Sequence, residues 1–397
     1  MKFKVVIFSG SRSEYSLIKP ILQNFKKKKI VSLYSVISNS HFQKEYGNSY
    51  NEFKKDNIKI NKKIIPPKLK KNFLIENNLK IIKELSSYLK KIKPNFFIIY
   101  GDRFETFTAA YAASFLQIPI IHIEGGDITE GGAYDDIFRH SITKLSHLHI
   151  TTNLTSYNNL LKLGEEKWRV KKFGLPSLDN ITKIEISKFI FLKKKYNLGN
   201  SNSFIIFTIH PLSNDLQQST KEANNSFSAI LELSKTYTII VTYPNNDYGS
   251  EYIIKKITTI SKSNNPNIKI VKNLGGKDYF GFLNLSNKLD FKSICVGNSS
   301  SGIKEAKSFN CPTINIGNRQ NGRMKTSAVI DCKAKKSEII KKCVFALENN
   351  KFRNSIKKIP NPYFMTNSSL KIVNYILNSK YNLRKLLLKK IRLINEK

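Results

Sequence analysis

Short apolar runs alternate, along the first half of the chain, with longer stretches in which apolar residues recur at helical spacing. The short runs have the length of β-strands, and a regular succession of strand, helix and strand favours parallel βαβ units. The strands predicted in this half are Lys4 to Ser9, Ser32 to Ser38, Phe96 to Tyr100, Ile118 to Ile123 and His147 to Thr152.

The pattern breaks after Gly174-Leu175-Pro176-Ser177, where a lysine-rich helix (Lys188 to Tyr196) and a run of turn formers (Asn197 to Asn202) follow. A second strand series then begins, with Phe204 to Ile209, Tyr237 to Thr242, Ile268 to Val271, Ser293 to Val296 and Thr313 to Ile316. We therefore predict an α/β protein with two doubly wound, Rossmann-like domains facing a cleft. The predicted boundaries are residues 1–180, residues 181–365 and a C-terminal helical tail, residues 366–397.

A length of 397 residues suits two domains, and no apolar run approaches the roughly 20 residues that span a bilayer. The N-terminus fits a first strand better than a signal peptide, because no cleavage site or longer apolar region follows it. Four cysteines without Cys-x-x-Cys spacing suggest neither a disulfide framework nor a zinc ribbon. We expect a soluble protein of the cytoplasm, without a transmembrane segment.

Lysine and arginine number 67 against 29 acidic residues, a formal net charge of +38. Such an excess raises nucleic acid or an anionic membrane as a partner, and Leu383 to Ile394 fits an amphipathic basic helix. The excess is nearly all lysine, however, spread along the chain without a recognition motif. We therefore expect no specific nucleic-acid partner, and a basic helix that packs onto the protein's own surface or a twin subunit. We also expect a homo-oligomer, a dimer or tetramer.

Candidate chemistry follows the strands, because ligands of parallel sheets bind beyond the carboxyl ends of the strands. The first strand runs into Ser9-Gly10-Ser11-Arg12, a small-residue turn opening a helix whose free N–H groups favour an anion. The third strand of this half ends in Gly101-Asp102-Arg103, which puts a carboxylate beside a guanidinium. Each segment by itself also fits a plain structural turn.

The most informative stretch runs from Ile120 to His140, where a strand leads into two double-glycine turns and an acidic helix start. Five carboxylates fall within thirteen residues, namely Glu124, Asp127, Glu130, Asp135 and Asp136. Like charges this close repel one another, which favours chemistry over a purely structural loop. Such clusters also bind Mg²⁺ or Ca²⁺, but the glycine spacing is not that of a calcium loop, and we expect no metal.

Three loops of the second half offer ligands for a nucleotide. His210 ends a strand where its ring can reach a phosphate. Gly297 to Glu305 is a Gly/Ser turn opening a helix, whose hydroxyls and N–H groups suit a diphosphate, while Glu305 can hold both hydroxyls of a ribose. Simple helix capping is the alternative. Gly317 to Arg323 adds two further cations.

Four motifs stand in order along the chain. They are Gly101-Asp102-Arg103-Phe104-Glu105, His122-Ile123-Glu124-Gly125-Gly126-Asp127, Asp135-Asp136 with Arg139-His140, and Gly297-Asn298-Ser299-Ser300 with Gly302 and Glu305. Together they resemble the hydrolysing UDP-N-acetylglucosamine 2-epimerases, the family that feeds sialic-acid and related nonulosonate synthesis. The resemblance extends to about residue 380.

The resemblance implies a glycosyltransferase-B-like fold, with UDP held mainly by the second domain and the sugar facing the first. Asp102, Glu124 and Asp135 would act on the sugar; a loop slightly longer than in many relatives leaves Asp136 as the alternative to Asp135. Arg139 and His210 complete the implied catalytic set. The implied UDP-binding residues are Arg12, Ser16, Arg103, Asn245, Ser299, Ser300, Glu305 and Arg319.

The implied chemistry suits these residue types. The C2 proton of an acetamido sugar is not acidic, so it leaves only as the C1–O bond to UDP breaks, giving a glycal. Water then adds at C1 while an acid protonates C2 from the opposite face, which requires at least two carboxylates in different protonation states. No cofactor is required.

Other readings remain open at this stage. The same motifs fit a hydrolysing epimerase for a UDP-linked 2,4-diacetamido-trideoxyhexose, and a related branch epimerises without hydrolysis. That branch usually lacks the Glu-Gly-Gly-Asp and Asp-Asp-x-x-Arg-His runs, which favours hydrolysis. A glycosyltransferase would share the nucleotide residues without needing the acidic cluster. A basic nucleic-acid-binding or membrane-surface protein is the non-enzyme alternative.

Overall fold

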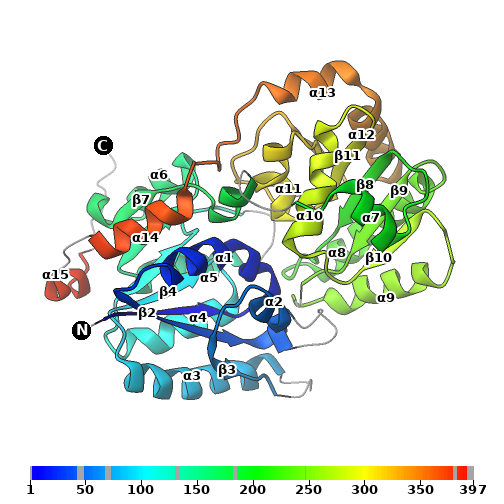
Figure 1. The fold of residues 1–397 in the computed structure, drawn as a ribbon. Helices are drawn as coiled ribbons and strands as arrows, with labels where there is room; N and C mark the ends of the chain where they lie inside the picture. The colour runs from blue at the N-terminus through cyan, green and yellow to red at the C-terminus, as the bar shows by residue number, and fades with distance from the viewer. Residues whose placement is uncertain are drawn as a thin grey trace. The chain divides into compact units, whose positions relative to one another are not determined.

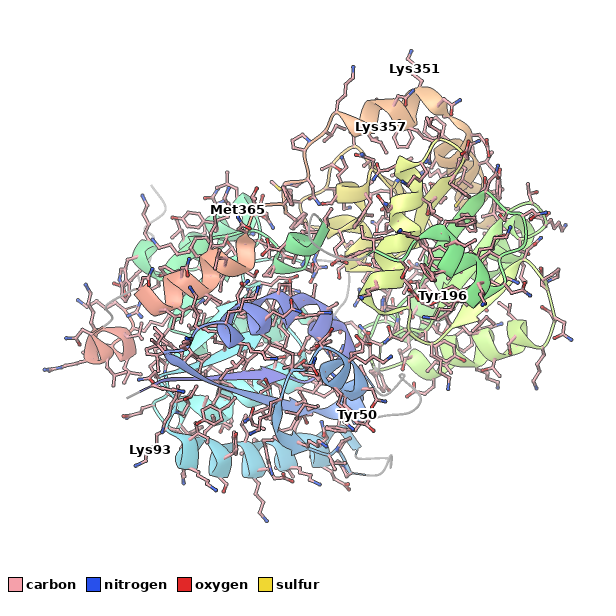
Figure 2. The ribbon with its side chains drawn as sticks, in the orientation of Figure 1. Tyr50, Lys93, Tyr196, Lys351, Lys357 and Met365 are labelled. Atoms are coloured by element: carbon pink, nitrogen blue, oxygen red, sulfur yellow. The ribbon has the colours of Figure 1, made fainter. Side chains whose placement is uncertain are left out.

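The computed structural model describes residues 2–42, 49–67, 73–129, 135–181, 186–245, 247–378 and 382–390. Contacts divide the chain into two compact units. Unit 1 comprises Met1–Ile128, Asp135–Asn180 and Met365–Lys397, and unit 2 is built on Ile181–Phe364. The chain therefore returns to unit 1 at Met365, which is labelled in Figure 2.

Unit 1 is a parallel sheet with helices around it (Figure 1). Its described strands follow the order β3-β2-β1-β4-β5-β6-β7. They are β1 (Phe3–Ser9), β2 (Val31–Ser38), β3 (Ile60–Ile64), β4 (Phe96–Tyr100), β5 (Ile120–Ile123), β6 (Leu148–Thr151) and β7 (Val170–Lys172). The helices are α1 (Arg12–Lys26), α2 (Tyr50–Lys55), α3 (Phe73–Ile92), α4 (Phe104–Ser114), α5 (Asp135–Leu145), α6 (Leu154–Lys162), α14 (Ser368–Asn378) and α15 (Leu383–Leu387).

Unit 2 repeats this architecture with strands in the order β10-β9-β8-β11-β12-β13 (Figure 1). They are β8 (Ser203–Thr208), β9 (Thr238–Thr242), β10 (Ile268–Val271), β11 (Lys292–Gly297), β12 (Thr313–Ile316) and β13 (Val329–Cys332). The helices are α7 (Phe189–Tyr196), α8 (Leu216–Leu233), α9 (Ser250–Ser261), α10 (Gly275–Asn284), α11 (Ser300–Lys304), α12 (Lys336–Glu348) and α13 (Asn350–Lys357). In both units the first three strands run outward to one edge of the sheet, and the chain then crosses back to β4 or β11 on the other side of the first strand, which is the doubly wound arrangement.

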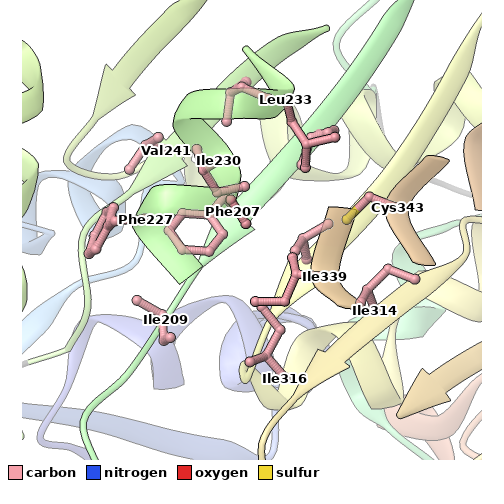
Figure 3. Packing of buried hydrophobic residues seen from close by; sticks show 14 of the residues in the cluster. Phe207, Ile209, Phe227, Ile230, Leu233, Val241, Ile314, Ile316, Ile339 and Cys343 are labelled. Carbon is pink, nitrogen blue, oxygen red and sulfur yellow. The ribbon is translucent and has the colours of Figure 1, made fainter. Parts of the chain in front are cut away.

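The central strand β8 shows why these sequences fold as sheets covered on both faces. Ile205 and Phe207 belong to one buried cluster with residues of α8 and α12, whereas Phe204 and Ile206 belong to another on the opposite face. Figure 3 shows the first cluster, in which Phe207 lies beside Phe227. Because successive side chains of a strand point to opposite faces, a strand of continuous apolar residues needs helices on both.

The predicted fold class, two doubly wound α/β domains, is confirmed. Three edge strands, β3, β7 and β13, were not predicted. Their sequences are Ile-Asn-Lys-Lys-Ile, Val-Lys-Lys and Val-Ile-Asp-Cys, and edge strands face water enough to carry polar residues that hide the strand pattern.

Both units carry exposed lysines. Figure 2 shows Lys93, which follows α3, and Lys351 and Lys357 on α13, and all three are exposed. Among the described residues, no helix is long and apolar enough to cross a membrane.

Candidate active site

The loops after β4 and β5 carry the first two predicted carboxylates to one edge of the unit 1 sheet. The two strands are neighbours, and Gly101 N donates to Ile123 O at 2.9 Å. Glu124 N donates to Ile150 O at 2.8 Å, which ties the next loop to β6. Asp102 and Glu124 therefore extend from adjacent strand ends.

Glu124 has a left-handed backbone, with φ of 72°. A non-glycine residue there stores strain of order 1 kcal/mol, and such residues cluster at functional sites. The following turn packs closely against α6, since a Cβ on Gly126 (φ 85°) would lie 2.3 Å from Ser156 O. The double glycine of the sequence is thus what allows the strained glutamate and the tight turn to coexist.

Arg139 on α5 joins the acidic groups of two loops. The side chain is 1% exposed, and its Nε donates to Asp102 Oδ2 at 3.1 Å. Its Nη atoms pair with Asp102 and Asp136, and Nη1 also donates to Asp127 O at 3.1 Å. Burial alone lowers the pKa of Arg139, but the Asp102 and Asp127 carboxylates outweigh it and raise the pKa above its usual value, so the cation is retained. The buried Arg139 cation thus compensates the negative charge of the carboxylates around it.

His122 is a buried residue that contacts the loop after β4 and helix α5. Its ring is fully buried, with Nε2 2.8 Å from Gly101 O and Nδ1 3.4 Å from Thr143 Oγ1. Burial lowers its pKa to about 3, so the ring is neutral at physiological pH and donates through Nε2 to the carbonyl. His122 therefore links the turn before Asp102 to helix α5.

The described carboxylates of this acidic stretch have different hydrogen-bond partners. Asp127 is 4% exposed and accepts hydrogen bonds from Ser156 Oγ and from Asn153 Nδ2, the N-cap of α6. Asp136 pairs with Arg139 and lies 3.4 Å from His140 Nε2, while Asp135 begins α5. Glu130 lies outside the described residues. Asp127 is thus engaged at the start of α6.

Two buried carboxylates, Glu14 and Glu105, lie in the first turns of α1 and α4; Glu14 was not predicted, and Glu105 was quoted in a motif without a role. Glu14 Oε2 accepts from Gly10 N at 2.8 Å and from Ser9 Oγ at 3.2 Å. Glu105 accepts from Arg103 Nε at 3.2 Å. The capping-box spacing from Ser11 to Glu14, which begins α1 at Arg12, was the signal that could have found Glu14.

We expect Glu14 to make stability depend on pH. Burial, and then the Glu105 carboxylate, raise the pKa of Glu14 to about 7 from 4.5. The folded state then binds more protons than the unfolded state. The contribution of Glu14 to the unfolding free energy is therefore complete below pH 4.5 and decreases as the pH rises toward 7. Relative to Glu14→Gln, the wild type should lose about 3 kcal/mol of unfolding free energy across this window, measured by urea melts. Parallel pH curves for the two proteins would contradict this assignment.

In unit 2, Asn298 joins the loops after β8, β11 and β12. Its Oδ1 accepts from His210 N at 2.7 Å, and its Nδ2 donates to His210 O at 2.9 Å. Its carbonyl accepts from Arg319 Nη1 at 3.3 Å and Gln320 Nε2 at 2.8 Å. Asn298 was quoted in a motif but not assigned a role, because its partners lie 88 and 21–22 residues away.

The Gly/Ser turn lies directly against β8. Gly297 has φ of 131°, and a Cβ there would lie 1.8 Å from Thr208 O, so only glycine fits. Ser299 is the N-cap of α11, and Ser301 Oγ lies 3.1 Å from Ser299 Oγ and accepts from Tyr279 OH at 2.8 Å. The turn is thus fixed by the close approach of Gly297 to β8 and by the hydrogen bond from Tyr279 to Ser301.

His210, Asp247 and Arg319 form a charged group beside that turn. Asp247 Oδ2 lies 3.8 Å from His210 Nδ1 and 4.0 Å from Arg319 Nη2. Nδ1 of His210 also accepts from Asn245 N at 3.4 Å. Asp247 was not predicted, since it follows β9 at a distance in sequence from both partners.

The structure gathers the predicted residues into two sets, one in each unit. Asp102, Arg103, Glu124, Asp135, Asp136 and Arg139 lie at the carboxyl edge of the unit 1 sheet, with Ser16 in α1. His210, Asn245, Ser299 and Arg319 lie in the loops that follow strands of the unit 2 sheet, and Ser300 and Glu305 lie at the two ends of α11. The side chain of Arg12 lies outside the described part of the protein. Within that part, no group of three or more His, Cys, Asp or Glu side chains could hold a metal ion.

Two doubly wound domains in one chain, with ligand-type loops at both carboxyl edges, define the glycosyltransferase-B-like class. A solved structure of the same architecture is UDP-GlcNAc 2-epimerase from Neisseria meningitidis bound to UDP-GlcNAc, with a TM-score of 0.78 and 22% identity. It aligns with 95% of this chain and all of that one.

Sequence comparison identifies the family. The profile of UDP-N-acetylglucosamine 2-epimerase matches residues 23–377, and the chain belongs to that family. It is 31% identical to the GDP/UDP-N,N'-diacetylbacillosamine 2-epimerase (hydrolyzing) of Campylobacter jejuni, over 83% of this chain and 84% of the relative. It is 29% identical to a UDP-N-acetylglucosamine 2-epimerase of Neisseria meningitidis serogroup B, over 82% and 83%. The predicted family resemblance is confirmed.

Proposed function

We propose that the protein is a hydrolysing epimerase that converts UDP-N-acetylglucosamine and water to N-acetylmannosamine and UDP. The observation that carries the proposal is the buried Arg139, which pairs with Asp102 and Asp136, while the strained Glu124 follows the strand next to that of Asp102. Family membership and a hydrolysing relative at 31% identity support it.

The chemistry needs carboxylates on two faces of the sugar. One removes the C2 proton while the C1–O bond to UDP breaks, which leaves a C1–C2 double bond and free UDP. A second delivers a proton to C2 from the opposite face while water supplies the hydroxyl at C1. We assign these roles to Asp102, Glu124 and Asp135, with Asp136, which pairs with Arg139 and lies near His140, as the alternative to Asp135. Arg139 then holds Asp102 in place and fixes the start of α5.

We assign UDP binding mainly to unit 2. Ser299 and Ser300 open α11, where hydroxyl and N–H groups suit a diphosphate, and His210 and Arg319 offer N–H donors to the charge that develops on the leaving group. Glu305 suits ribose hydroxyls. The remaining assigned residues are Arg12, Ser16, Arg103 and Asn245.

A second candidate differs only in the sugar. The relative with 31% identity is named for N,N'-diacetylbacillosamine, whereas the N-acetylglucosamine relative is 29% identical. The alternative substrate is therefore a UDP-linked 2,4-diacetamido-trideoxyhexose, with the same proton transfers at C2.

Two further properties belong to this proposal. All four cysteines are buried free thiols, which supports a reducing cytoplasm.

Tyr111 and Phe115 on or next to α4, and Ile137 on α5, are 41%, 71% and 63% exposed. These apolar side chains support a homo-oligomer, so sedimentation should give two or four times the 45.6 kDa chain mass.

Incubation in deuterated water tests the function. With UDP-N-acetylglucosamine and neither acceptor nor added metal, proton NMR should show free N-acetylmannosamine carrying deuterium at C2, with one UDP for each sugar. The label appears because the second carboxylate, which delivers the new hydrogen to C2 from the opposite face, carries a deuteron taken from the solvent.

Each other product points to a different reaction. Accumulating UDP-N-acetylmannosamine would indicate epimerisation without hydrolysis, and free N-acetylglucosamine that keeps its C2 proton would indicate simple hydrolysis. If this sugar is inert while the 2,4-diacetamido analogue gives the same labelling, the second candidate is correct.

A further inference from the structure

The C-terminal segment 382–390 packs onto unit 1, to which α14 also belongs (Figure 1, orange and red). The sequence predicted a basic amphipathic helix over Leu383 to Ile394, but α15 ends at Leu387, and residues 388–390 are not helical. The early end has a physical reason, because the carbonyls of this segment bond to a side chain instead. The segment also lies beyond residues 23–377, the range matched by the family.

Arg169 anchors the segment. Its side chain is fully buried, and its Nη atoms donate to the carbonyls of Leu386 at 2.8 Å, Lys385 at 3.1 Å and Leu388 at 3.2 Å. Its Nε pairs with Glu166 at 2.7 Å, and its guanidinium lies 4.2 Å from the ring centroid of Trp168. A fully engaged guanidinium of this kind holds the segment in one register.

Lys389 extends from that anchored segment to the end of α5. Its Nζ donates to Thr143 O and Ser146 O, both at 2.8 Å, and lies 3.3 Å from Lys144 O. Carbonyls at the end of a helix have no partner within the helix, and the helix dipole favours a cation there. Lys389 therefore caps the C-terminus of α5 from a distant part of the chain.

A buried carboxylate fixes the ammonium in this position. Glu165 Oε2 lies 2.8 Å from Lys389 Nζ and 2.9 Å from His149 Nε2, and Oε1 lies 3.1 Å from Lys144 Nζ. Burial lowers the pKa of Lys389 to about 8, with Glu165 opposing the change, so the side chain is largely charged at neutral pH.

The other end of α5 bears the groups of the candidate site. Asp135 and Asp136 stand in its first turn, and Arg139 follows one turn later. In the last turns, Thr143 contacts His122, which in turn bonds to Gly101 O next to Asp102. A helix of 11 residues is a short rod of about 16 Å, so a shift at one end moves the other.

We propose that Lys389 is a positioning residue that caps α5 and thereby sets the position of Asp135, Asp136 and Arg139. The proposal rests on the proposed function for the role of these side chains, but the cap itself does not. The C-terminal segment thus contributes to the candidate site of unit 1 by positioning α5, although it contacts no reacting atom.

The test compares three single variants of the full chain. Lys389→Met removes the ammonium and keeps the apolar stem, Lys389→Arg keeps the charge, and Lys385→Met is the matched control, because Lys385 contacts the Trp168 ring and not α5. For Lys389→Met we expect kcat to fall about tenfold with KM changed less than twofold, since misplacement affects the reacting geometry more than binding. Lys389→Arg should recover kcat to within about threefold of the wild type, and Lys385→Met should match it.

Hydrogen exchange of amides 140–146 supplies a readout that does not depend on turnover. Faster exchange there in Lys389→Met, with unchanged exchange in the central strands β1 and β4, supports the cap. Wild-type exchange in α5, or a loss of activity that only follows the fraction of unfolded protein, overturns the proposal. If the wild type acts on neither sugar, the proposed function fails, and the exchange measurement alone decides whether Lys389 holds α5.

Discussion

Glu124→Gln, Asp102→Asn and Asp135→Asn are each expected to lower turnover by at least about 100-fold, the scale of a lost general acid or base. Each change removes a carboxylate and keeps the size of the side chain, so the chain should still fold. The effect should fall on kcat, because UDP binding is assigned mainly to unit 2 and to none of these three carboxylates. Steady-state kinetics and calorimetry with UDP measure the two separately.

Two controls sharpen this result. Glu84→Gln removes a carboxylate on α3 that pairs with Lys62 and Lys80, away from the site, and should leave turnover unchanged. Glu305→Ala should show the opposite pattern, a weaker affinity for UDP without unfolding. Wild-type turnover in two of the three carboxylate variants would remove the mechanism.

Arg139→Met is expected to destabilise unit 1 by about 3 kcal/mol and to abolish turnover. The guanidinium is buried, and its loss leaves Asp102 and Asp136 close together without the cation between them. Breaking a buried ion pair costs about 3 to 5 kcal/mol, and the lower figure applies because the two carboxylates are 22% and 24% exposed and reach water. Urea unfolding measures the change.

A milder variant separates stability from positioning. Arg139→Lys keeps the charge, but an ammonium cannot bind Asp102, Asp136 and Asp127 O with the planar fork of arginine. We expect a folded protein with turnover at least about tenfold below the wild type. Lys162→Met, at an exposed position on α6, is the control for losing a cation. A wild-type unfolding free energy for Arg139→Met would disprove the central role of this side chain.

Strand prediction succeeded where burial on both faces leaves a clear pattern. The predicted strand Lys4 to Ser9 appears as Phe3–Ser9, and Phe204 to Ile209 appears as Ser203–Thr208. At the edges, Ile60–Ile64 carries three consecutive polar residues that interrupt the apolar pattern, so its pairing with β2 could not be seen. The basic run after Leu387 was predicted as helix from its amphipathic pattern, whereas tertiary bonds from Arg169 and Lys389 decide its conformation.

In the candidate site, too, local features could be predicted from the sequence and contacts between distant residues could not. Its loops could be found because strand ends, glycines and clustered charges lie within a few residues of one another. Its contacts could not be found, since Arg139 lies 37 residues from Asp102 and Asn298 lies 88 residues from His210. The buried Glu14 beside Glu105 joins turns 91 residues apart.

The sequence by itself determined the fold class, the family and the loops that hold the candidate chemistry, because periodicity, turn residues and motif order are local properties of the chain. Only the tertiary structure decided which carboxylates meet Arg139, that Asp127 is engaged at α6, and that Lys389 caps α5. These outcomes depend on burial and on distances between residues far apart in sequence. A buried charge takes its partner from whichever group the fold brings within hydrogen-bond reach.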